Sequence, residues 1–323
     1  MRRLVIPIFL ILSLVGCTSP APTAVELETV MPTAVPFNVE NTRAPVINET
    51  PTFAFATQSA EIPVADTPTA SASDWQSLPI IPEVSPEMIA VYQRGLERGR
   101  KPNRFSKIGD CQNITTYYLA MFDSGSYKLG DQYAYLQPTI DYFKGSWWRQ
   151  SLAVKGGMNV AAVQNVMWAD PKQCKTGETP LQCELRVYNP SFAIISMEES
   201  WAGSISNYDF YMRKIVEYTL SLDIVPILAT RAETPTQERQ INATVAKIAA
   251  DYHLPLWNFW AATANMPNNG IIIGDGFHLT GKDEIPEVRS HFDDPANLLF
   301  AWTQRNLTAL QAIDAVFHGV TGQ

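Results

Sequence analysis

Residues 104–111 read RFSKIGDC, a short run with apolar character that ends at a Gly-Asp pair followed by a thiol. Such a run is typical of a strand in an open α/β sheet, where ligands bind at the carboxyl ends of the strands. A strand that stops at Gly109 and Asp110 would deliver the side chain and backbone N–H of Cys111 to that edge. Cys111 is therefore a candidate functional residue, and we expect Asp110 to hold the turn.

A second motif lies far downstream, where residues 274–280 read GDGFHLT. Asp275 precedes His278 by three residues, a spacing at which the carboxylate can accept the imidazole Nδ1–H and leave Nε2 free to take a proton. Cys111, His278 and Asp275 are thus a candidate nucleophile, base and orienting residue. The other histidines have no such context and are expected on the surface or in the core: His253, His291 and His318.

The two motifs, and the alternation of strands and helices expected between them, resemble the first and last sequence blocks of the SGNH (GDSL-type) hydrolases over roughly residues 100–318. In that family the first block reads Gly-Asp-Ser, and the Ser is the nucleophile. The resemblance implies ester hydrolysis with Cys111 in that role. A thiol is readily ionised beside a His, so a Cys111–His278–Asp275 arrangement is chemically workable.

The resemblance also implies donors for the oxyanion of acyl transfer. Besides the N–H of Cys111, the second block places Gly156 there, or Gly157 if the register slips by one; a tight turn after a strand explains both glycines equally well. The third block departs from the usual Gly-x-Asn-Asp, because residues 198–200 read EES. Ser200 is nearest to the Asn position, and loss of one donor can cost ~2.7–4 kcal/mol. The competing interpretation is therefore a retained fold that binds a glycan or an acyl-bearing ligand without turnover.

The N-terminus has the pattern of an export signal. Two arginines precede an apolar stretch at residues 4–15 that is too short to span a bilayer comfortably. The stretch ends in LVGC, which resembles the lipobox of bacterial lipoproteins and implies cleavage before Cys17 and acylation of that residue; the alternative is an ordinary signal peptide with a chance Cys. More than one acyl chain gives stable membrane attachment. We expect residues 1–17 to be a lipoprotein signal and the body to lie in the cell envelope, outside the cytoplasm.

The rest of the chain divides by composition. Residues 18–77 are rich in Pro, Thr, Ala and Ser without hydrophobic periodicity, which predicts a disordered tether, and residues 78–323 are expected to form one SGNH-like domain. The alternating pattern there predicts a parallel, doubly wound sheet, and with the resemblance a flavodoxin-like three-layer α/β/α sandwich. Strands are expected at 104–109, 150–154, 190–197, 224–230 and 254–259, and helices at 132–143, 208–222, 241–252 and 307–317.

Charge and cysteine content indicate which partners and which covalent links to expect. The chain has 24 Lys and Arg against 32 Asp and Glu, for a net charge of −8, and no basic cluster, which argues against nucleic acid. Cys174 and Cys183 flank a short polar loop, so outside the cytoplasm a disulfide is expected, with two free thiols as the alternative. No cofactor or metal is expected. The oligomeric state and the orientation of the two glutamates before Ser200 are left open.

A small acyl ester or a glycan is the expected ligand. Several tryptophans could stack on sugars, although for Trp257 and Trp260 packing in the core is the simpler interpretation. The candidates are Trp147, Trp148, Trp201, Trp257 and Trp260.

Overall fold

Four parallel strands form the sheet of this protein, in the order β1-β2-β3-β4. The computed structural model describes residues 72–197, 201–237, 240–282 and 284–323. The strands are β1 Lys101–Gly109, β2 Pro190–Ser196, β3 Val225–Ala229 and β4 Leu256–Trp257. Every residue of β2 and β3 is buried, as expected for apolar runs inside a parallel sheet.

The expected second strand at 150–154 is reduced to a single bridge. Gly109 pairs in parallel with Val154 on one side and with Ser196 of β2 on the other. The segment around Val154, which follows β1 in the chain, therefore lies beside β1 on the side away from β2. The chain then returns across β1 to form β2. This is the strand order of flavodoxin-like sheets, and the point where the order reverses is where such folds bind ligands. Cys111 follows β1 at that point.

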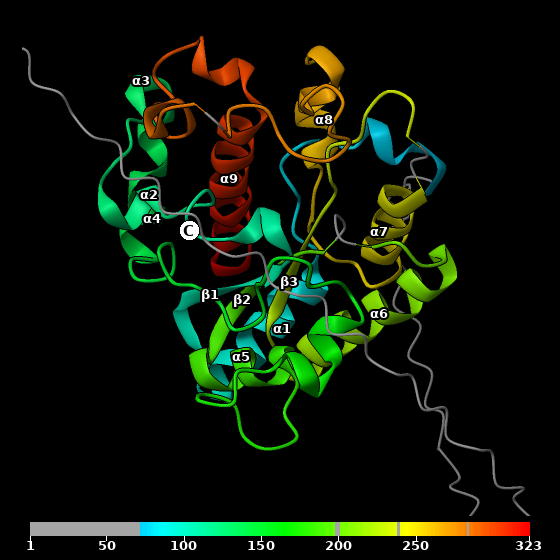
Figure 1. The fold of residues 1–323 in the computed structure, drawn as a ribbon. Coiled ribbons are helices and arrows are strands. Elements are labelled where there is room, and N and C mark those ends of the chain that lie inside the picture. The colour runs from blue at the N-terminus through cyan, green and yellow to red at the C-terminus, as the bar shows by residue number, and fades with distance from the viewer. Residues whose placement is uncertain (1–71, 198–200, 238–239, 283) are drawn as a thin grey trace, which may run out of the picture. The chain divides into compact units, whose positions relative to one another are not determined.

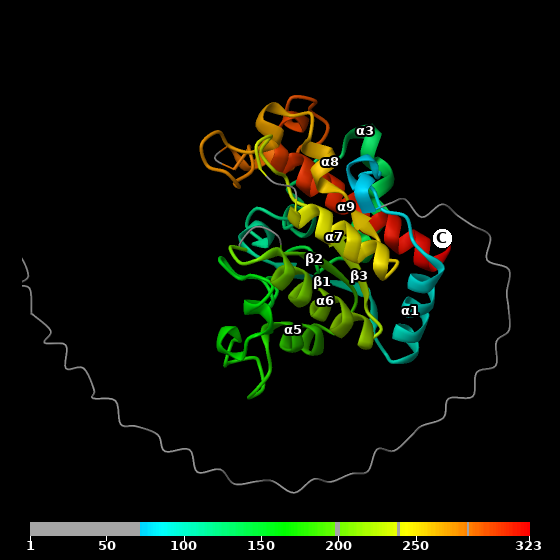
Figure 2. The ribbon, with the colours of Figure 1, turned by 90° about the vertical axis from the view of Figure 1, so that its right-hand side faces the viewer.

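Helices cover both faces of the sheet. In Figures 1 and 2, α9 lies on one side of the strands, and α5 and α6 lie on the other. Helix α7 packs against α6 and β3, and α1 packs against α9, β2 and β3. The predicted three-layer α/β/α architecture is thus confirmed. The longer helices are α1 Pro86–Glu97, α5 Pro180–Tyr188, α6 Ile205–Ser221, α7 Gln240–Asp251 and α9 Ala301–Thr321.

The helix predicted at 132–143 is broken into short pieces. These are α3 Gly130–Tyr133, the 3-10 turn at Ala134–Leu136 and α4 Gln137–Tyr142. Pro138 stands in the first turn of α4, where its missing N–H is tolerated, and it could not continue a helix arriving from the N-terminal side. Two further short helices are α2 Met121–Ser124 and α8 Phe259–Thr263.

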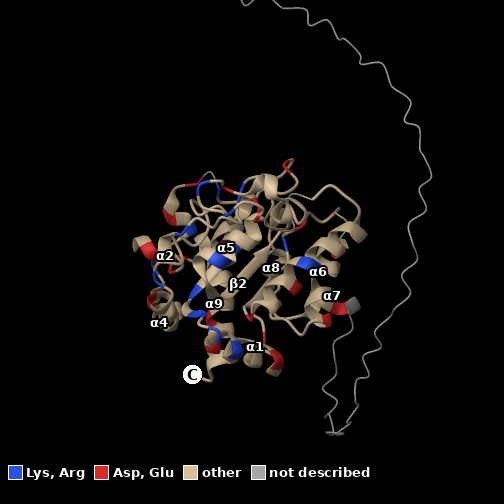
Figure 3. Ribbon diagram, turned by 90° about the horizontal axis from the view of Figure 1, so that it is seen from below, with Lys and Arg blue, Asp and Glu red and all other residues tan. Residues whose placement is uncertain are grey.

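Charged side chains anchor α1 at the amino edge of the sheet. Basic and acidic residues lie interspersed around this helix (Figure 3). Arg94 and Arg98 both pair with Asp223, at 2.9 and 2.8 Å. Because Asp223 lies just before β3, the two ion pairs fix α1 to the start of that strand.

The folded part begins earlier than the composition suggested. Residues 72–77, assigned above to the tether, form a 3-10 helix at Ala72–Ser77. Trp75 in this helix is only 4% exposed and packs edge-on against Trp260 with ring centroids 5.1 Å apart. The Nδ2 of Asn258 donates to the carbonyl oxygen of Trp75 at 3.0 Å. Burial of this large aromatic ring therefore places residues 72–77 with the folded domain and not with the expected tether.

Other expectations on the N-terminal region lie outside the described residues, namely the signal at 1–17, the lipidated Cys17 and the tether up to 71. Within the described part of the chain, no helix combines the length and apolar character needed to cross a membrane. The predicted disulfide is confirmed: Cys174 and Cys183 are bonded, with their Cα atoms 5.2 Å apart.

Candidate active site

The Cys111 turn is built by the residues on either side of the thiol. Asp110 caps a 3-10 turn at Cys111–Asn113, and its Oδ1 accepts from the backbone N–H of Gln112 at 3.2 Å. The Nδ2 of Asn113 donates to the carbonyl oxygen of Ser196, at the end of β2, at 2.8 Å. The turn is thereby fastened to the neighbouring strand, and Cys111 is held half-buried at the carboxyl edge.

Gly109 makes this turn sterically feasible. A Cβ at this position would lie 2.2 Å from Cγ of Asn113 and 2.6 Å from the carbonyl oxygen of Ser196. The close approach of the two backbones therefore requires a glycine directly before the Asp110–Cys111 pair.

The second motif has the geometry expected of a base and its orienting acid. Nδ1 of His278 lies 2.7 Å from Oδ2 of Asp275, and the backbone N–H groups of His278 and Phe277 donate to Oδ1 at 2.9 and 3.3 Å. Partial burial acts to raise the pKa of Asp275, but these hydrogen bonds from His278 and Phe277 outweigh it and lower the pKa. An ionised Asp275 holds the proton on Nδ1, so Nε2 of His278 is left with its lone pair.

One hydrogen bond joins the two motifs across 165 residues of sequence. Nε2 of Gln112 donates to the carbonyl oxygen of Phe277 at 2.8 Å. Cys111 is the residue before Gln112, and His278 is the residue after Phe277. The structure thus brings the candidate nucleophile and the candidate base to the same edge of the sheet.

Neighbouring segments hold the His278 loop in place. Nε2 of Gln237, in the loop after β3, donates to the carbonyl oxygen of Gly276 at 2.7 Å. The first turn of α9 holds the other end, since the N–H of Ala301 donates to Oγ1 of Thr280 at 3.0 Å and that of Trp302 to its carbonyl oxygen at 3.1 Å.

The glycines predicted as oxyanion donors lie in a turn. The N–H of Met158 donates to the carbonyl oxygen of Lys155 at 3.0 Å, and Gly157 has a φ of +76°, which only glycine adopts easily. The turn conformation therefore accounts for the glycine at position 157. Gly156 stands two residues beyond Val154, the bridge partner of Gly109, and its role as a donor stays a prediction.

The third predicted donor, Ser200, lies outside the described residues, as do Glu198 and Glu199.

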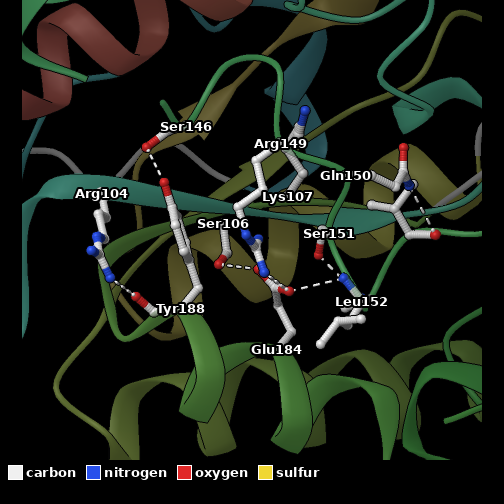
Figure 4. A network of polar contacts seen from close by, with 12 residues as sticks. Arg104, Ser106, Lys107, Ser146, Arg149, Gln150, Ser151, Leu152, Glu184 and Tyr188 are labelled. Carbon is white, nitrogen blue, oxygen red and sulfur yellow. Dashed lines mark hydrogen bonds and ion pairs between the residues drawn. The ribbon is translucent and has the colours of Figure 1, made fainter. Parts of the chain in front are cut away.

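Sequence analysis did not single out the buried carboxylate of Glu184, which lies within a network of polar contacts beside β1 (Figure 4). Glu184 of α5 is fully buried, and its two oxygens accept from Nη1 and Nη2 of Arg149 at 2.5 and 2.7 Å. Oγ of Ser106 in β1 donates to Oε1 at 2.5 Å, and the N–H of Leu152 donates to Oε2 at 2.9 Å. Glu184 thereby ties residues 149–152 to β1 and sets up the contact between Val154 and Gly109.

Lys107 is a second buried charged residue of β1. It is 2% exposed, and its Nζ donates to Oγ1 of Thr115 at 3.2 Å and to the carbonyl oxygen of Trp147 at 3.0 Å. Burial lowers the pKa of Lys107 to about 7, an effect partly opposed by the charge of Glu184. The amine therefore fastens the segment that follows the Cys111 turn.

A cavity of about 170 Å³ opens between the loops that follow β2 and β3, and Trp201, Arg231 and Gln240 line it together with Gly203, Ile205 and Ile241. Trp201 is half-buried. The remaining candidates for sugar stacking differ: Trp147, Trp257 and Trp260 are buried in the core, and Trp148 is 61% exposed.

Comparison with known proteins gives distant likenesses. No known family and no curated protein matches the sequence. A candidate lipolytic protein of the G-D-S-L family from Desulfitobacterium hafniense DCB-2 is similar with a TM-score of 0.42 and 10% identity, over 66% of this chain and 99% of that one. A GDSL-like lipase from Bacteroides thetaiotaomicron VPI-5482 is similar with a TM-score of 0.39 and 15% identity, over 70% of this chain and 98% of that one. The chain is thus similar to two GDSL-type proteins, at scores that carry no inference about its activity.

Proposed function

We propose that this protein is an ester hydrolase of the SGNH type in which Cys111 is the nucleophile, His278 the general base and Asp275 the residue that orients it. The observation that carries the proposal is the hydrogen bond between Asp275 and Nδ1 of His278, at 2.7 Å, in a loop that Gln112 joins to the Cys111 turn. A nucleophile, a base and an orienting acid on one sheet edge are what acyl transfer requires.

The reaction follows from these roles. Nε2 of His278 takes the thiol proton as Sγ of Cys111 attacks the acyl carbon, and a tetrahedral oxyanion forms. Its collapse breaks the bond to the alcohol oxygen, which receives the proton from His278, and leaves a thioester on Cys111. A water molecule, deprotonated by His278, then attacks the thioester, releasing the carboxylic acid and restoring the thiol.

Two parts of the site would stabilise charge during this reaction. The lowered pKa of Asp275 keeps its carboxylate ionised near neutral pH, so that it stabilises the imidazolium of His278 when that forms. The N–H groups of Cys111 and Gly156 and the hydroxyl of Ser200 are the donors we assign to the oxyanion.

The substrate and the location belong to the same proposal. The lipobox-like ending at Cys17 supports a protein tethered to a membrane in the cell envelope, outside the cytoplasm. A small acyl ester, on a glycan or a lipid of that compartment, is the proposed substrate.

Hydrolysis of p-nitrophenyl acetate tests the proposal. The wild-type protein should turn the ester over, whereas Cys111→Ala and His278→Ala should each abolish turnover. His253→Ala is the matched control, because His253 is exposed in the turn between α7 and β4, at the opposite edge of the sheet. Turnover that survives in both the Cys111 and the His278 variants would refute the assignment.

A second function is favoured by the cavity beside Trp201. A half-buried aromatic residue that lines a cavity together with Arg231 and Gln240 suits a sugar, which offers an apolar face and hydroxyl groups. In that case the protein binds a glycan without turnover. Isothermal titration with xylan- and chitin-derived oligosaccharides tests this function, and the absence of binding to all of them would count against it.

A further inference from the structure

Arg305 is a buried arginine of α9 that lies behind the Cys111 turn. Its residue surface is 0% exposed. Nη2 donates to Oγ of Ser196 at 2.8 Å, and Nε points to the carbonyl oxygen of Gln112 at 3.4 Å. Arg305 therefore contacts the residue after Cys111 and the last residue of β2, which is the pairing partner of Gly109.

The guanidinium is surrounded by aromatic rings and neutral acceptors. Its central carbon lies 4.9 Å from the ring centroid of Tyr118, 5.4 Å from that of Trp257 and 5.2 Å from that of Phe259. Among residues 72–197, 201–237, 240–282 and 284–323, no carboxylate forms an ion pair with Arg305, and its Nη1 has no hydrogen-bond acceptor. Since arginine does not lose its proton in proteins, the side chain is a fixed positive charge.

A charge in this position is costly for stability alone. Removing an ion from water carries a large desolvation penalty, which contacts with aromatic rings offset only in part. An apolar side chain of similar length would fill the same space among three aromatic rings without that cost. The charge is instead placed beside the turn where a thiolate and an oxyanion would form, which is where a fixed cation stabilises the reaction most.

We propose that Arg305 is a positioning residue that holds the Cys111 turn against β2 and supplies the positive charge that favours the thiolate. The inference rests on the proposed function in so far as Cys111 is the nucleophile. The other titratable groups of the two motifs are Asp110 in the turn and Asp275 and His278 in the loop that Gln112 joins to it. The two carboxylates oppose a thiolate, so a cation on the side of α9 compensates them.

Thiol alkylation tests the proposal without any ester substrate. A chain that begins at residue 18 contains all the described residues and lacks Cys17. Because Cys174 and Cys183 are bonded to each other, Cys111 is its cysteine outside a disulfide. The rate of reaction with iodoacetamide is measured from pH 5 to 10. We expect Arg305→Met to react about tenfold more slowly at a pH below both titration midpoints, because loss of the charge moves the midpoint upward by about one unit. Arg305→Lys keeps the charge and should stay within about threefold of wild type.

Arg100→Met is the matched control. Arg100 also donates from Nε to a carbonyl oxygen, that of Leu222 at 2.9 Å, and from Nη1 to Oδ1 of Asn189 at 2.7 Å, but it lies just before β1, at the amino edge of the sheet. Its variant should alkylate like wild type. A folded Arg305→Met with the wild-type midpoint, or an Arg305→Lys that is as slow as Arg305→Met, would overturn the proposal.

Further measurements cover the case in which the Met variant does not fold, as judged by near-UV circular dichroism. Arg305→Gln keeps an amide donor without the charge and should show the same tenfold loss. If neither neutral variant folds, the wild-type ratio of iodoacetate to iodoacetamide rates decides: it should exceed that of free cysteine, and an equal or lower ratio overturns the proposal.

The two proposals fail in different ways. A wild-type protein that hydrolyses no ester but has an Arg305-dependent thiol refutes the proposed function and leaves this inference standing. Hydrolysis through Cys111 with a thiol indifferent to Arg305 does the reverse.

Discussion

The buried pair of Glu184 and Arg149 should be the most sensitive point of the fold near the site. Glu184→Gln removes the negative charge that receives both terminal nitrogens of Arg149, at 2.5 and 2.7 Å. It keeps the size of the side chain, so no cavity is created. One of its two oxygens is replaced by an NH2 group that faces donors, so the bond from Leu152 or from Ser106 is lost together with one of the two bonds from Arg149.

The expected loss of stability depends on how exposed the side chains of Glu184 and Arg149 are. Breaking a buried ion pair by removing one partner costs about 3–5 kcal/mol. The side chain of Arg149 is 22% exposed and that of Glu184 is 0% exposed. In Glu184→Gln the remaining arginine is partly hydrated, so we expect a loss near the lower end, about 3 kcal/mol. Arg149→Met leaves the carboxylate buried without its cation and should cost more, about 4–5 kcal/mol.

Urea unfolding at pH 7, followed by circular dichroism and tryptophan fluorescence, measures both losses. The double variant Glu184→Leu/Arg149→Met should recover part of them, because an apolar pair can replace a buried ion pair. Asp209→Asn, which disrupts an ion pair with Arg213 on the surface of α6, is the control and should cost less than about 1 kcal/mol. A loss below about 1 kcal/mol for Glu184→Gln, or a larger loss there than in Arg149→Met, would refute this reasoning.

Three further predictions concern single residues. Because burial lowers the pKa of Lys107 to about 7, the unfolded chain binds a proton between pH 7 and about 10 that the folded protein does not, so stability should rise with pH over this range. Urea unfolding at pH 7 and 9 should show this rise in wild type and not in Lys107→Met; a rise of the same size in the variant would exclude Lys107 as its source. Asp275→Asn should lower kcat for p-nitrophenyl acetate by about 10³–10⁴ with little change in KM, because an amide does not hold the proton on Nδ1 of His278; equal kcat values would contradict the orienting role. Trp75→Ala should lower the free energy of unfolding by about 3–5 kcal/mol, whereas unchanged stability would return the domain boundary to residue 78.

The strands of the sheet could be predicted where a continuous run of apolar residues marks them in the sequence. The apolar runs of β2 and β3 are continuous because both faces of these strands are covered, and they stand out in the sequence. Residues 150–154 also have strand character, but only Val154 pairs with β1, because the bonds of this segment go to Glu184 and to its own turn. That outcome depends on α5, which was not predicted.

The helix α5 did carry a local signal. Thr179 and Gln182 form a capping box, and Pro180 stands at the first helical position. The signal was present in the polar loop between the two cysteines, where a disulfide was the more obvious reading. With this helix recognised, Glu184 would stand out as a charged residue beside buried Leu181 and Leu185.

In the candidate site, contacts within one motif could be predicted from the sequence, and contacts between distant segments could not. The bond between Asp275 and His278 spans three residues, so the motif alone predicts it. The bond from Gln112 to Phe277 joins segments 165 residues apart, and the burial of Arg305 depends on aromatic residues from three separate elements. Contacts of this kind arise from tertiary packing and cannot be deduced from spacing.

The central claim is that Cys111 and His278 form a reactive pair, and the pH dependence of Cys111 alkylation in wild type and His278→Ala tests it most directly. The same chain from residue 18 is used, with iodoacetamide as the reagent. We predict a wild-type thiol that titrates well below the ordinary cysteine value of about 8.5, with the shift lost in the variant. A thiol that is inert, or whose midpoint is the same with and without His278, would mean that Cys111 is a structural cysteine and would contradict the proposed mechanism.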